Sequence, residues 1–571
     1  MNVRACEVKR TVCQRNSIRP EESEASPGVV HPSVPVPGIC GIRKGTGLPQ
    51  LILAFVGLLL PCMLEATVYN VKAGGGGQYT TIQACANATV AGDTCTVYAG
   101  TYNEVVTLSH SGTGTGGVCT SCITIQVNPG DTVNVYGFSI SANYVIVNGF
   151  TITDPSMSHA SAGVLFTTAT AGVQIINNTI TQVGQGNACI RIPGSTSGWA
   201  SYATFSGNNI SWCSAIPGQT NLNAATGMTA YGYHLLVSNN TISHTTNGIG
   251  VSGADIVLLG NSYGPVNAAT DFGPQQNHVD YVEVGITSNL LVENNYEHDI
   301  LGVGGAHAWL MQSHTSSYSI QRFNTIYNVG TGYGDFEYPF IKDYNNTIVN
   351  DALQTSILVG NFKNGATNSA FINDLIYNSA NPAGTSQQYY TVDSSSLAGF
   401  ASGNNLAFDT SCVAGTLAGC TFGLMLTDSG NIYADPKFVN PVSDFHLQAD
   451  SPALNAGRYL TTVASGDNGS GTSLIVNDAG FFQNGYGITG IDSDCIAVTT
   501  VTNHVCITAV NYLTNTLTLA GSILRSAGDH VWLYSDSTGR QVLVGKAPNI
   551  GATFGPGSPP APPTNLTATP Q

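Results

Sequence analysis

Short apolar segments separated by asparagine-rich turns repeat along the middle of this chain. The clearest copy is Val173-Gln-Ile-Ile-Asn-Asn-Thr-Ile180, and variants of it recur from about Val145 to Leu406. Successive copies are spaced about 21 to 34 residues apart, a period typical of solenoid proteins. The pattern predicts one long repeat domain in which each copy forms one rung of a stack.

Within a copy, apolar and polar side chains alternate, as expected for a strand with one face in the interior of a coil and one in solvent. The paired residues Asn177 and Asn178 supply the bend, because asparagine tolerates left-handed backbone angles. Stacked asparagine side chains can hydrogen-bond from rung to rung. We therefore expect these pairs to be structural and not a ligand set.

The segment before the repeats has the features of a cap. Tyr79–Ala84 reads as a short amphipathic helix, and Gly92–Tyr102 as a strand followed by a turn. Here the chain resembles secreted right-handed parallel β-helix proteins of the pectate-lyase-like superfamily, in which such a segment seals the end of the solenoid. The resemblance implies an all-β fold, a right-handed parallel β-helix with an N-terminal cap, over about residues 68–460.

The C-terminal part predicts an insertion. Asp435–Phe438, Asp444–Leu447 and Ser451–Gly457 resemble the closing motif of such proteins, but the Ile550–Ala552 that ends it arrives about ninety residues late. The alternating pattern between them predicts a small antiparallel β subdomain that packs on the coil or binds sugar, packing being favoured. The expected organisation is a leader (1–66), β-helix (67–460), antiparallel insertion (461–535), closing segment (536–554) and proline-rich tail (555–571).

An apolar run near the start predicts export. Leu51–Leu60 follows Arg43 and Lys44 and precedes the small-residue end of Leu64–Ala66, the order of a secretory signal. No second run of that length follows, so we expect a secreted or cell-surface protein with no membrane insertion after signal removal. Its net charge of −16 argues against nucleic acid as a partner.

Ten cysteines after the leader fall into five sequence-local pairs, which an exported chain would oxidise. Zinc at Cys119 and Cys122 is the competing reading, but no second cysteine or histidine pair lies near them. The expected disulfides are Cys85–Cys95, Cys119–Cys122, Cys189–Cys213, Cys412–Cys420 and Cys495–Cys506.

Candidate chemistry gathers between residues 271 and 343, which hold nine acidic and two basic residues in a chain that is only 9% charged. Three tripeptides there are about one rung apart: His278–Asp280, His307–Trp309 and Asp335–Glu337. Aligning them predicts two outward columns, His278 over His307 over Asp335, and Asp280 over Trp309 over Glu337. The direction of Glu283 is left open, because it is out of phase with Asp280.

These columns suit a polysaccharide site. A sugar ring would stack on Trp309, with His314 as a further substrate contact. In a hydrolase, Asp335 or Glu337 would be the general acid and Asp280 the base, since carboxylates about 7 to 10 Å apart leave room for a water molecule.

A lyase would use other groups of the same stretch. Asp280, Glu283 and Glu337 would hold Ca²⁺ to neutralise a uronate carboxylate. Lys342, Arg322 or His307 would remove the proton. Where the alginate lyase and chondroitinase B pattern has its two glutamates and its lysine, however, this chain has Gly305, His307 and Gln312.

The repeat pattern is also compatible with a non-catalytic protein. A β-helix at a cell surface or in a matrix would bind glycan or span distance, and fold alone does not decide between the readings. The sequence therefore predicts a polysaccharide partner, leans toward an enzyme, and leaves the oligomeric state open.

Overall fold

The structure is a computed structural model that describes residues 66–184, 188–194, 199–217, 226–273, 278–301, 305–311, 315–329, 332–350, 358–378, 388–409 and 428–552. The predicted signal segment, the proline-rich tail, His314 and the Cys412–Cys420 pair lie outside these residues. No helix among the described residues is long and apolar enough to cross a membrane.

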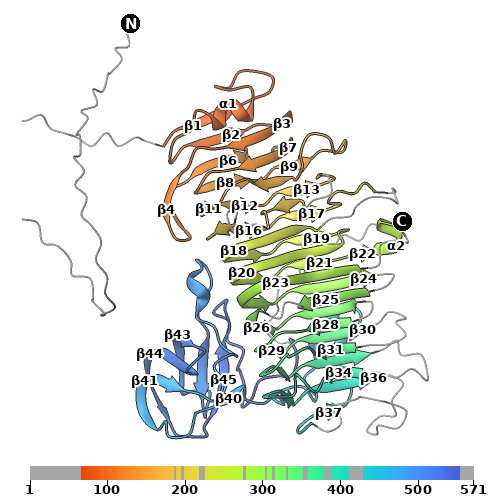
Figure 1. Cartoon of the computed structure of the whole chain (residues 1–571), viewed down its shortest axis with the longest axis vertical. Helices are drawn as coiled ribbons and strands as arrows, with labels where there is room; N and C mark the ends of the chain where they lie inside the picture. Colours follow the sequence, from red (N-terminus) through yellow and green to blue (C-terminus); the bar gives the residue numbers. More distant parts are fainter. Residues whose placement is uncertain are drawn as a thin grey trace, which may run out of the picture. The chain divides into compact units, whose positions relative to one another are not determined.

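The repeats form a parallel β-helix, as predicted, in which strands pair in register with the equivalent strands of neighbouring rungs (Figure 1). The pairing runs in three columns, which we call the first, second and third sheets. Three long strands bend from the first sheet into the second, namely β18 (Met228–Ser238), β20 (Asn247–Leu259) and β23 (His278–Glu293).

Most of the other strands belong to one sheet each; the strand Val133–Ile140 also pairs near its start with Thr151–Thr153 of the third sheet. The first sheet holds β3 (Gly100–Leu108), β7 (Val133–Ile140), β10 (Val164–Phe166), β14 (Ile190–Arg191), β25 (Gly305–Met311), β28 (Gly332–Phe336), β31 (Leu358–Phe362) and β34 (Gln388–Val392). The second holds β1 (Val68–Val71), β2 (Thr94–Val97), β6 (Ile123–Val127), β8 (Val145–Asn148), β12 (Gln174–Ile176), β16 (Thr204–Ser206), β26 (Ser317–Arg322), β29 (Ile341–Tyr344), β32 (Ala370–Ile372) and β35 (Ala401–Gly403). The third holds β9 (Thr151–Thr153), β13 (Thr179–Thr181), β17 (Asn209–Ser211), β19 (Thr241–Ser243), β21 (Ser262–Tyr263), β24 (Tyr296–Leu301), β27 (Thr325–Val329), β30 (Thr347–Asn350), β33 (Leu375–Asn378), β36 (Leu406–Asp409) and β37 (Ile432–Tyr433). Short accessory elements are β4 (Thr113–Thr115), β5 (Val118–Ser121), β11 (Thr170–Ala171), β15 (Ala200–Ser201), β22 (Val266–Asn267) and α2 (Ala268–Asp271).

The N-terminal cap is built as expected. Helix α1 (Ile82–Ala86) starts at Thr81, whose side chain accepts a hydrogen bond from the backbone of Ala84. Ile82 and Cys85 are fully buried and belong to the continuous apolar core of the coil. Four predicted disulfides form, Cys85–Cys95, Cys119–Cys122, Cys189–Cys213 and Cys495–Cys506.

The predicted asparagine ladder runs along the turns between the second and third sheets. The side-chain oxygen of Asn208 accepts hydrogen bonds from both the backbone and the amide of Asn178, and the same pattern repeats rung after rung. The chain of buried residues is Asn178, Asn208, Asn240, Asn261, Asn295, Asn324, Asn346, Asp374 and Asn405. The residue before each member has a positive φ, which suits Gly207 or Asn177 but also occurs at Phe323 (57°).

One member of the ladder is an acid, Asp374. Each asparagine amide also donates to a backbone carbonyl of the preceding rung, as Asn346 does to Gln321 and Asn405 does to Phe371. An ionised Asp374 has no such proton, and its Oδ2 has no hydrogen-bond partner among the described residues. Burial and the neighbouring Asp343 carboxylate raise the pKa of Asp374 well above its ordinary value.

We expect Asp374→Asn to stabilise the protein at neutral pH by about 1 to 3 kcal/mol, because an amide restores the missing donor and removes a buried acid. The raised pKa means that the favourable protonated form is lost as pH rises, so the gain should be larger at pH 8 than at pH 5. Thermal unfolding at the two pH values measures it. The reverse exchange, Asn324→Asp, is the matched control and should destabilise; a variant Asp374→Asn that melts no higher than the parent would contradict the account.

The C-terminal part forms the predicted antiparallel subdomain. Its six strands are β40 (Thr461–Thr462), β41 (Gly469–Ile475), β42 (Cys495–Val498), β43 (His504–Asn511), β44 (Thr516–Arg525) and β45 (His530–Ser535), in the spatial order β40-β45-β42-β43-β44-β41. A single turn of 3₁₀ helix, Gly485–Gly487, lies between β41 and β42. Buried residues of the subdomain pack in one apolar cluster with Ile320, Phe323 and Tyr344 of the β-helix. Packing on the coil, the favoured reading of this insertion, is therefore observed.

The two halves of the closing motif meet despite their separation in sequence. Strands β38 (Phe438–Asn440) and β39 (Asp444–Leu447) pair with each other, and Phe438 packs with Ile550 over the third sheet. The backbone N–H of Ile550 donates to Ala453, and that of Gly551 donates to Asn373 of the coil. The third sheet is thus covered at this end, and the first sheet remains to be considered for function.

Candidate functional site

The register of the first sheet differs from the predicted columns. Strand β25 aligns His307 with Asp280, and Trp309 with Val282. Strand β28 aligns Asp335 with Leu310. The predicted stacks of His278 over His307 over Asp335, and of Asp280 over Trp309 over Glu337, are therefore wrong. Equal sequence spacing did not reveal the shift, because turns of unequal length separate the rungs.

The observed register aligns Gly250, Glu283, Leu310, Asp335, Asn361 and Thr391 in one column, which we call the outward column after its exposed member Glu283. Glu283 is exposed, whereas Asp280, its partner in the sequence-based site, is fully buried. Glu283 and Asp335 lie two rungs apart in this column, which places their Cα atoms about 10 Å from each other. The solvent-facing acid of β23 is therefore Glu283.

Asp335 and Glu337 share one cation. The ammonium of Lys363 lies 2.9 Å from Asp335 Oδ2 and 3.2 Å from Glu337 Oε1. The amide of Asn361 donates to Asp335 Oδ1 at 2.9 Å, and Thr391 donates to Asn361 at 2.9 Å. All three charged side chains keep some solvent contact, with 17%, 10% and 30% of Asp335, Glu337 and Lys363 exposed.

This cluster holds Lys363 in its charged form. Partial burial alone would lower the pKa of Lys363, but hydrogen bonds and the charges of Asp335 and Glu337 outweigh burial and raise it. A lysine in this state is a poor proton acceptor. It is suited to fixing the positions of two carboxylates.

An aromatic ring lies further along the same sheet. A Cβ atom on Gly250 would stand 3.5 Å from the hydroxyl of Tyr231, so the ring lies against this glycine. Burial and the charge of Glu283 raise the pKa of Tyr231. Gly250 precedes Glu283 in the outward column. The ring of Tyr231, the side-chain-free position of Gly250 and the carboxylate of Glu283 therefore follow one another along the sheet.

Of the three acids proposed to hold Ca²⁺, Glu337 pairs with Lys363, and Asp280 and Glu283 do not make a site that fits the ion. Asp280 is fully buried, while Glu283 is exposed and accepts a hydrogen bond from the amide of Asn247. The N–H₂ group of Asn247 lies beside the Glu283 carboxylate, where a bound Ca²⁺ ion would need an oxygen ligand. Ca²⁺ takes six to eight such oxygen ligands. No group of three aspartate, glutamate, histidine or cysteine side chains that could hold a metal ion occurs among the described residues.

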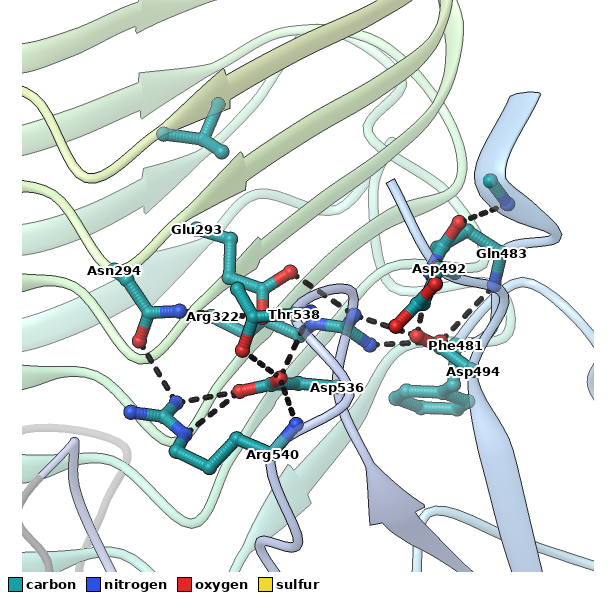
Figure 2. A network of polar contacts seen from close by, with 12 residues as sticks. Glu293, Asn294, Arg322, Phe481, Gln483, Asp492, Asp494, Asp536, Thr538 and Arg540 are labelled. Carbon is teal, nitrogen blue, oxygen red and sulfur yellow. Dashed lines mark hydrogen bonds and ion pairs between the residues drawn. The ribbon is translucent and has the colours of Figure 1, made fainter. Parts of the chain in front are cut away.

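Arg322 and Lys342 lie away from the first sheet, in strands β26 and β29 of the second. Arg322 is fully buried and pairs with Glu293 at 3.1 Å and with Asp494 of the C-terminal subdomain at 2.7 Å (Figure 2). Lys342 pairs with Asp478 of the subdomain at 2.7 Å and lies over the ring of Phe481. Both candidate bases therefore hold the subdomain on the coil and are not placed beside Glu283 or Asp335.

The network around Arg322 holds more carboxyl groups than the single charge of Arg322 can neutralise. Asp536 accepts hydrogen bonds from Arg540, which also donates to Asn294 of the coil (Figure 2). Burial raises the pKa of Glu293 to about 7; Arg322 opposes this, and Asp536 and Asp494 add to it. The folded protein therefore keeps a proton on Glu293 at pH values where the unfolded chain has lost it.

We expect this proton to make stability pH-dependent. The contribution of Glu293 is fully present below its ordinary pKa of 4.5 and is lost as pH rises to about 7, on the order of 3 kcal/mol. Glu293→Gln resembles the protonated form at every pH, so its melting temperature relative to the parent should rise between pH 5 and pH 8. An unchanged difference at the two pH values would show that Glu293 does not titrate in this range.

The remaining candidates are placed only in part. His278, His307 and Trp309 lie in strands β23 and β25 of the first sheet, where backbone pairing is described but their side chains are not. Sequence reasoning missed Lys363, Asn361 and Tyr231. A signal for Lys363 was present, since it follows Asp335 by 28 residues, about one rung.

The solved structures that resemble this one are distant from it in sequence. No family model matches this sequence, and no curated protein does. The structure is similar to that of pectate lyase Pel9A, with 13% identity, a TM-score of 0.39, and coverage of 71% of this chain and 94% of that one. It is also similar to a mannuronic acid specific polysaccharide family 6 lyase from human gut microbiota, with 11% identity, a TM-score of 0.40, and coverage of 66% of this chain and 88% of that one. A third similar structure is the GH136 lacto-N-biosidase from Eubacterium ramulus, with 10% identity, a TM-score of 0.34, and coverage of 65% of this chain and 67% of that one. Any site must therefore be argued from this chain's own residues.

Proposed function

We propose that this protein is an exported, carbohydrate-active β-helix protein that binds a polysaccharide along the outer face of the first sheet and hydrolyses it there. The observation that carries the proposal is the column in which Glu283 and Asp335 face solvent two rungs apart. Tyr231 offers a ring on which a sugar can stack. The four disulfides are compatible with an extracellular protein.

The geometry supports hydrolysis by inversion better than elimination. Side chains leaning from two such positions can bring their carboxyl groups into the separation of about 6.5 to 9.5 Å that accommodates a water molecule. Asp335, which accepts from Lys363 and Asn361, would act as base and take a proton from that water as its oxygen attacks the anomeric carbon. Glu283 would give a proton to the glycosidic oxygen as the C–O bond breaks. Lys363 and Asn361 are positioning residues in this scheme.

The lyase reading has less support. Two of its three candidate bases, Arg322 and Lys342, are at least 99% buried and engaged by acids of the subdomain. Its proposed Ca²⁺ ligands Asp280 and Glu283 differ in burial, as described above. Elimination would therefore depend on His307, which the backbone register places beside Asp280.

Activity against a panel of neutral and acidic polysaccharides tests the proposal. We expect new reducing ends, no ultraviolet-absorbing unsaturated product, and the same rate with and without EDTA. Unsaturated products would establish a lyase. Binding to a polysaccharide without any product would establish the non-catalytic alternative, and neither binding nor product would overturn the carbohydrate assignment.

A further inference from the structure

The outward column continues beyond Gly250 toward the N-terminal end of the coil, through Thr229 of β18 to Arg191 of β14. The two isoleucines that flank Arg191 in the sequence are buried in the core, whereas Arg191 is half-exposed. Strand alternation therefore places the Arg191 side chain on the outer face of the first sheet. Arg191 stands three rungs from Glu283, so their Cα atoms are about 14 Å apart.

Arg191 differs from the buried arginines of this chain. Its guanidinium makes no hydrogen bond or ion pair with any residue that the structure describes, whereas Arg322 and Arg525 each contact a carboxylate. The residues on either side of Arg191 in the column, Leu165 and Thr229, are uncharged. The planar guanidinium is thus available to an anionic group, and a carboxylate or sulfate ester can accept from it with two oxygen atoms.

The charge at the other end of the column is opposite. Asp335 and Glu337 carry two negative charges against the single positive charge of Lys363. Glu283 adds a carboxyl group between that end and Arg191. An anionic sugar is therefore attracted at Arg191 and repelled close to Asp335, where a neutral sugar meets no such repulsion.

The column between these charged ends carries small side chains. Its members there are Thr229 and Gly250, and the ring of Tyr231 lies beside them. A Cβ atom on Gly194 would stand 3.9 Å from Cε2 of Tyr231, and one on Gly250 would stand 3.8 Å from Cε1. The opposite edges of this ring thus face two neighbouring rungs, and a pyranose can pack on the ring. Each rung advances about 4.8 Å, close to the length of one sugar residue in an extended glycan.

We propose that Arg191 sets the specificity of the polysaccharide site by binding one anionic sugar, about three residues along the glycan from the bond at Glu283. The inference rests on the proposed function, because it uses the same face of the first sheet as the path of the glycan. The corresponding substrate is a heteropolysaccharide in which sugars with a carboxylate or sulfate ester are separated by neutral sugars. A homopolymer of uronic acid would bring further carboxylates close to Asp335.

Calorimetric titration tests this preference on the full chain carrying Glu283→Gln, which blocks cleavage and leaves Asp335 charged. The probes are oligosaccharides of glucuronoxylan and hyaluronan, which have spaced carboxylates, and of carrageenan, which has spaced sulfate esters. Each is compared with its carboxyl-reduced or desulfated form and with oligogalacturonate as the homopolymer. We expect a spaced anionic probe to bind about tenfold or more tightly than its neutral form and than the homopolymer, because a charge-assisted hydrogen bond is gained. The probe that binds identifies the anion as carboxylate or sulfate.

Variants then assign the contact. Arg191→Gln should weaken the anionic probe by about tenfold or more and leave its neutral form unchanged, and Arg191→Lys should lose less, because it keeps the charge without the fork. Arg458→Gln, at a half-exposed arginine beside Ser402 of the second sheet, is the matched control and should change neither. Melting temperatures check that each variant folds. The inference is overturned if no spaced anionic probe binds more tightly than its neutral form, if the homopolymer binds equally well, or if Arg191→Gln binds the anionic probe as the parent does.

A cleavage assay separates this inference from the proposed function. Products of the wild-type protein should carry the anionic sugar at one fixed place, about three residues from the new chain end, and mass spectrometry should find this regularity lost in Arg191→Gln. Binding that depends on Arg191 without any cleavage would overturn the proposed hydrolysis and keep this inference. Cleavage of a neutral glycan that Arg191→Gln leaves unchanged would do the reverse.

Discussion

Asp335→Asn is expected to reduce polysaccharide cleavage by about 100-fold or more, because removing a general base typically costs two to four orders of magnitude. Glu283→Gln should cause a loss of similar size through the general acid. The measurement is the rate of reducing-end release at saturating substrate, with the melting temperature of each variant recorded in parallel. The double variant should lose less than the product of the two single losses, because the two groups act in one step.

Two controls make this result specific. Asp435→Asn removes an exposed carboxylate near the closing motif and should leave the rate unchanged. Asp280→Asn alters a fully buried side chain, so it should change the melting temperature and not the rate of the folded protein. If Asp280→Asn abolishes cleavage in a stably folded protein while Glu283→Gln does not, the acid on the outward column has been chosen wrongly.

Arg322→Met is expected to destabilise the protein by about 3 to 5 kcal/mol, since it leaves Glu293 and Asp494 buried without their cation. Unfolding by denaturant, followed by the fluorescence of the four tryptophans, measures the loss. The double variant Arg322→Met with Asp494→Asn should recover part of it, because fewer charges remain unpaired.

The control for Arg322 is an exposed ion pair. Lys437 lies beside Asp450, and both side chains are largely exposed, so Lys437→Gln should cost no more than about 1 kcal/mol. An Arg322→Met variant that loses equally little would show that the buried network does not hold the subdomain on the coil.

The repeat itself predicts most of the fold. Alternating residues such as Val173 and Ile175 identify the strands, and the pair Asn177 and Asn178 identifies the turn, because both signals are local. The disulfides are local as well, with partners as few as three positions apart in the sequence. The antiparallel insertion was recognisable since the closing motif is interrupted.

The candidate site was less predictable, for two physical reasons. Asp280 and Glu283 are three residues apart on β23, so strand alternation places only one of them on the outer face, and the apolar Val279, Tyr281 and Val282 occupy both faces and do not show which one. The partners of the basic residues are distant in sequence: Asp494 is 172 residues from Arg322, and Asp478 is 136 residues from Lys342. No local pattern shows that these cations are already neutralised.

The most direct test of the central claim is a crystal structure of the Asp335→Asn variant with the oligosaccharide that the wild-type protein cleaves best. The account predicts a sugar chain lying across β23, β25 and β28 on the first sheet, with a glycosidic oxygen within hydrogen-bonding distance of Glu283 and a ring against Tyr231. An oligosaccharide bound elsewhere on the coil, with the first sheet empty at a saturating concentration, would contradict it.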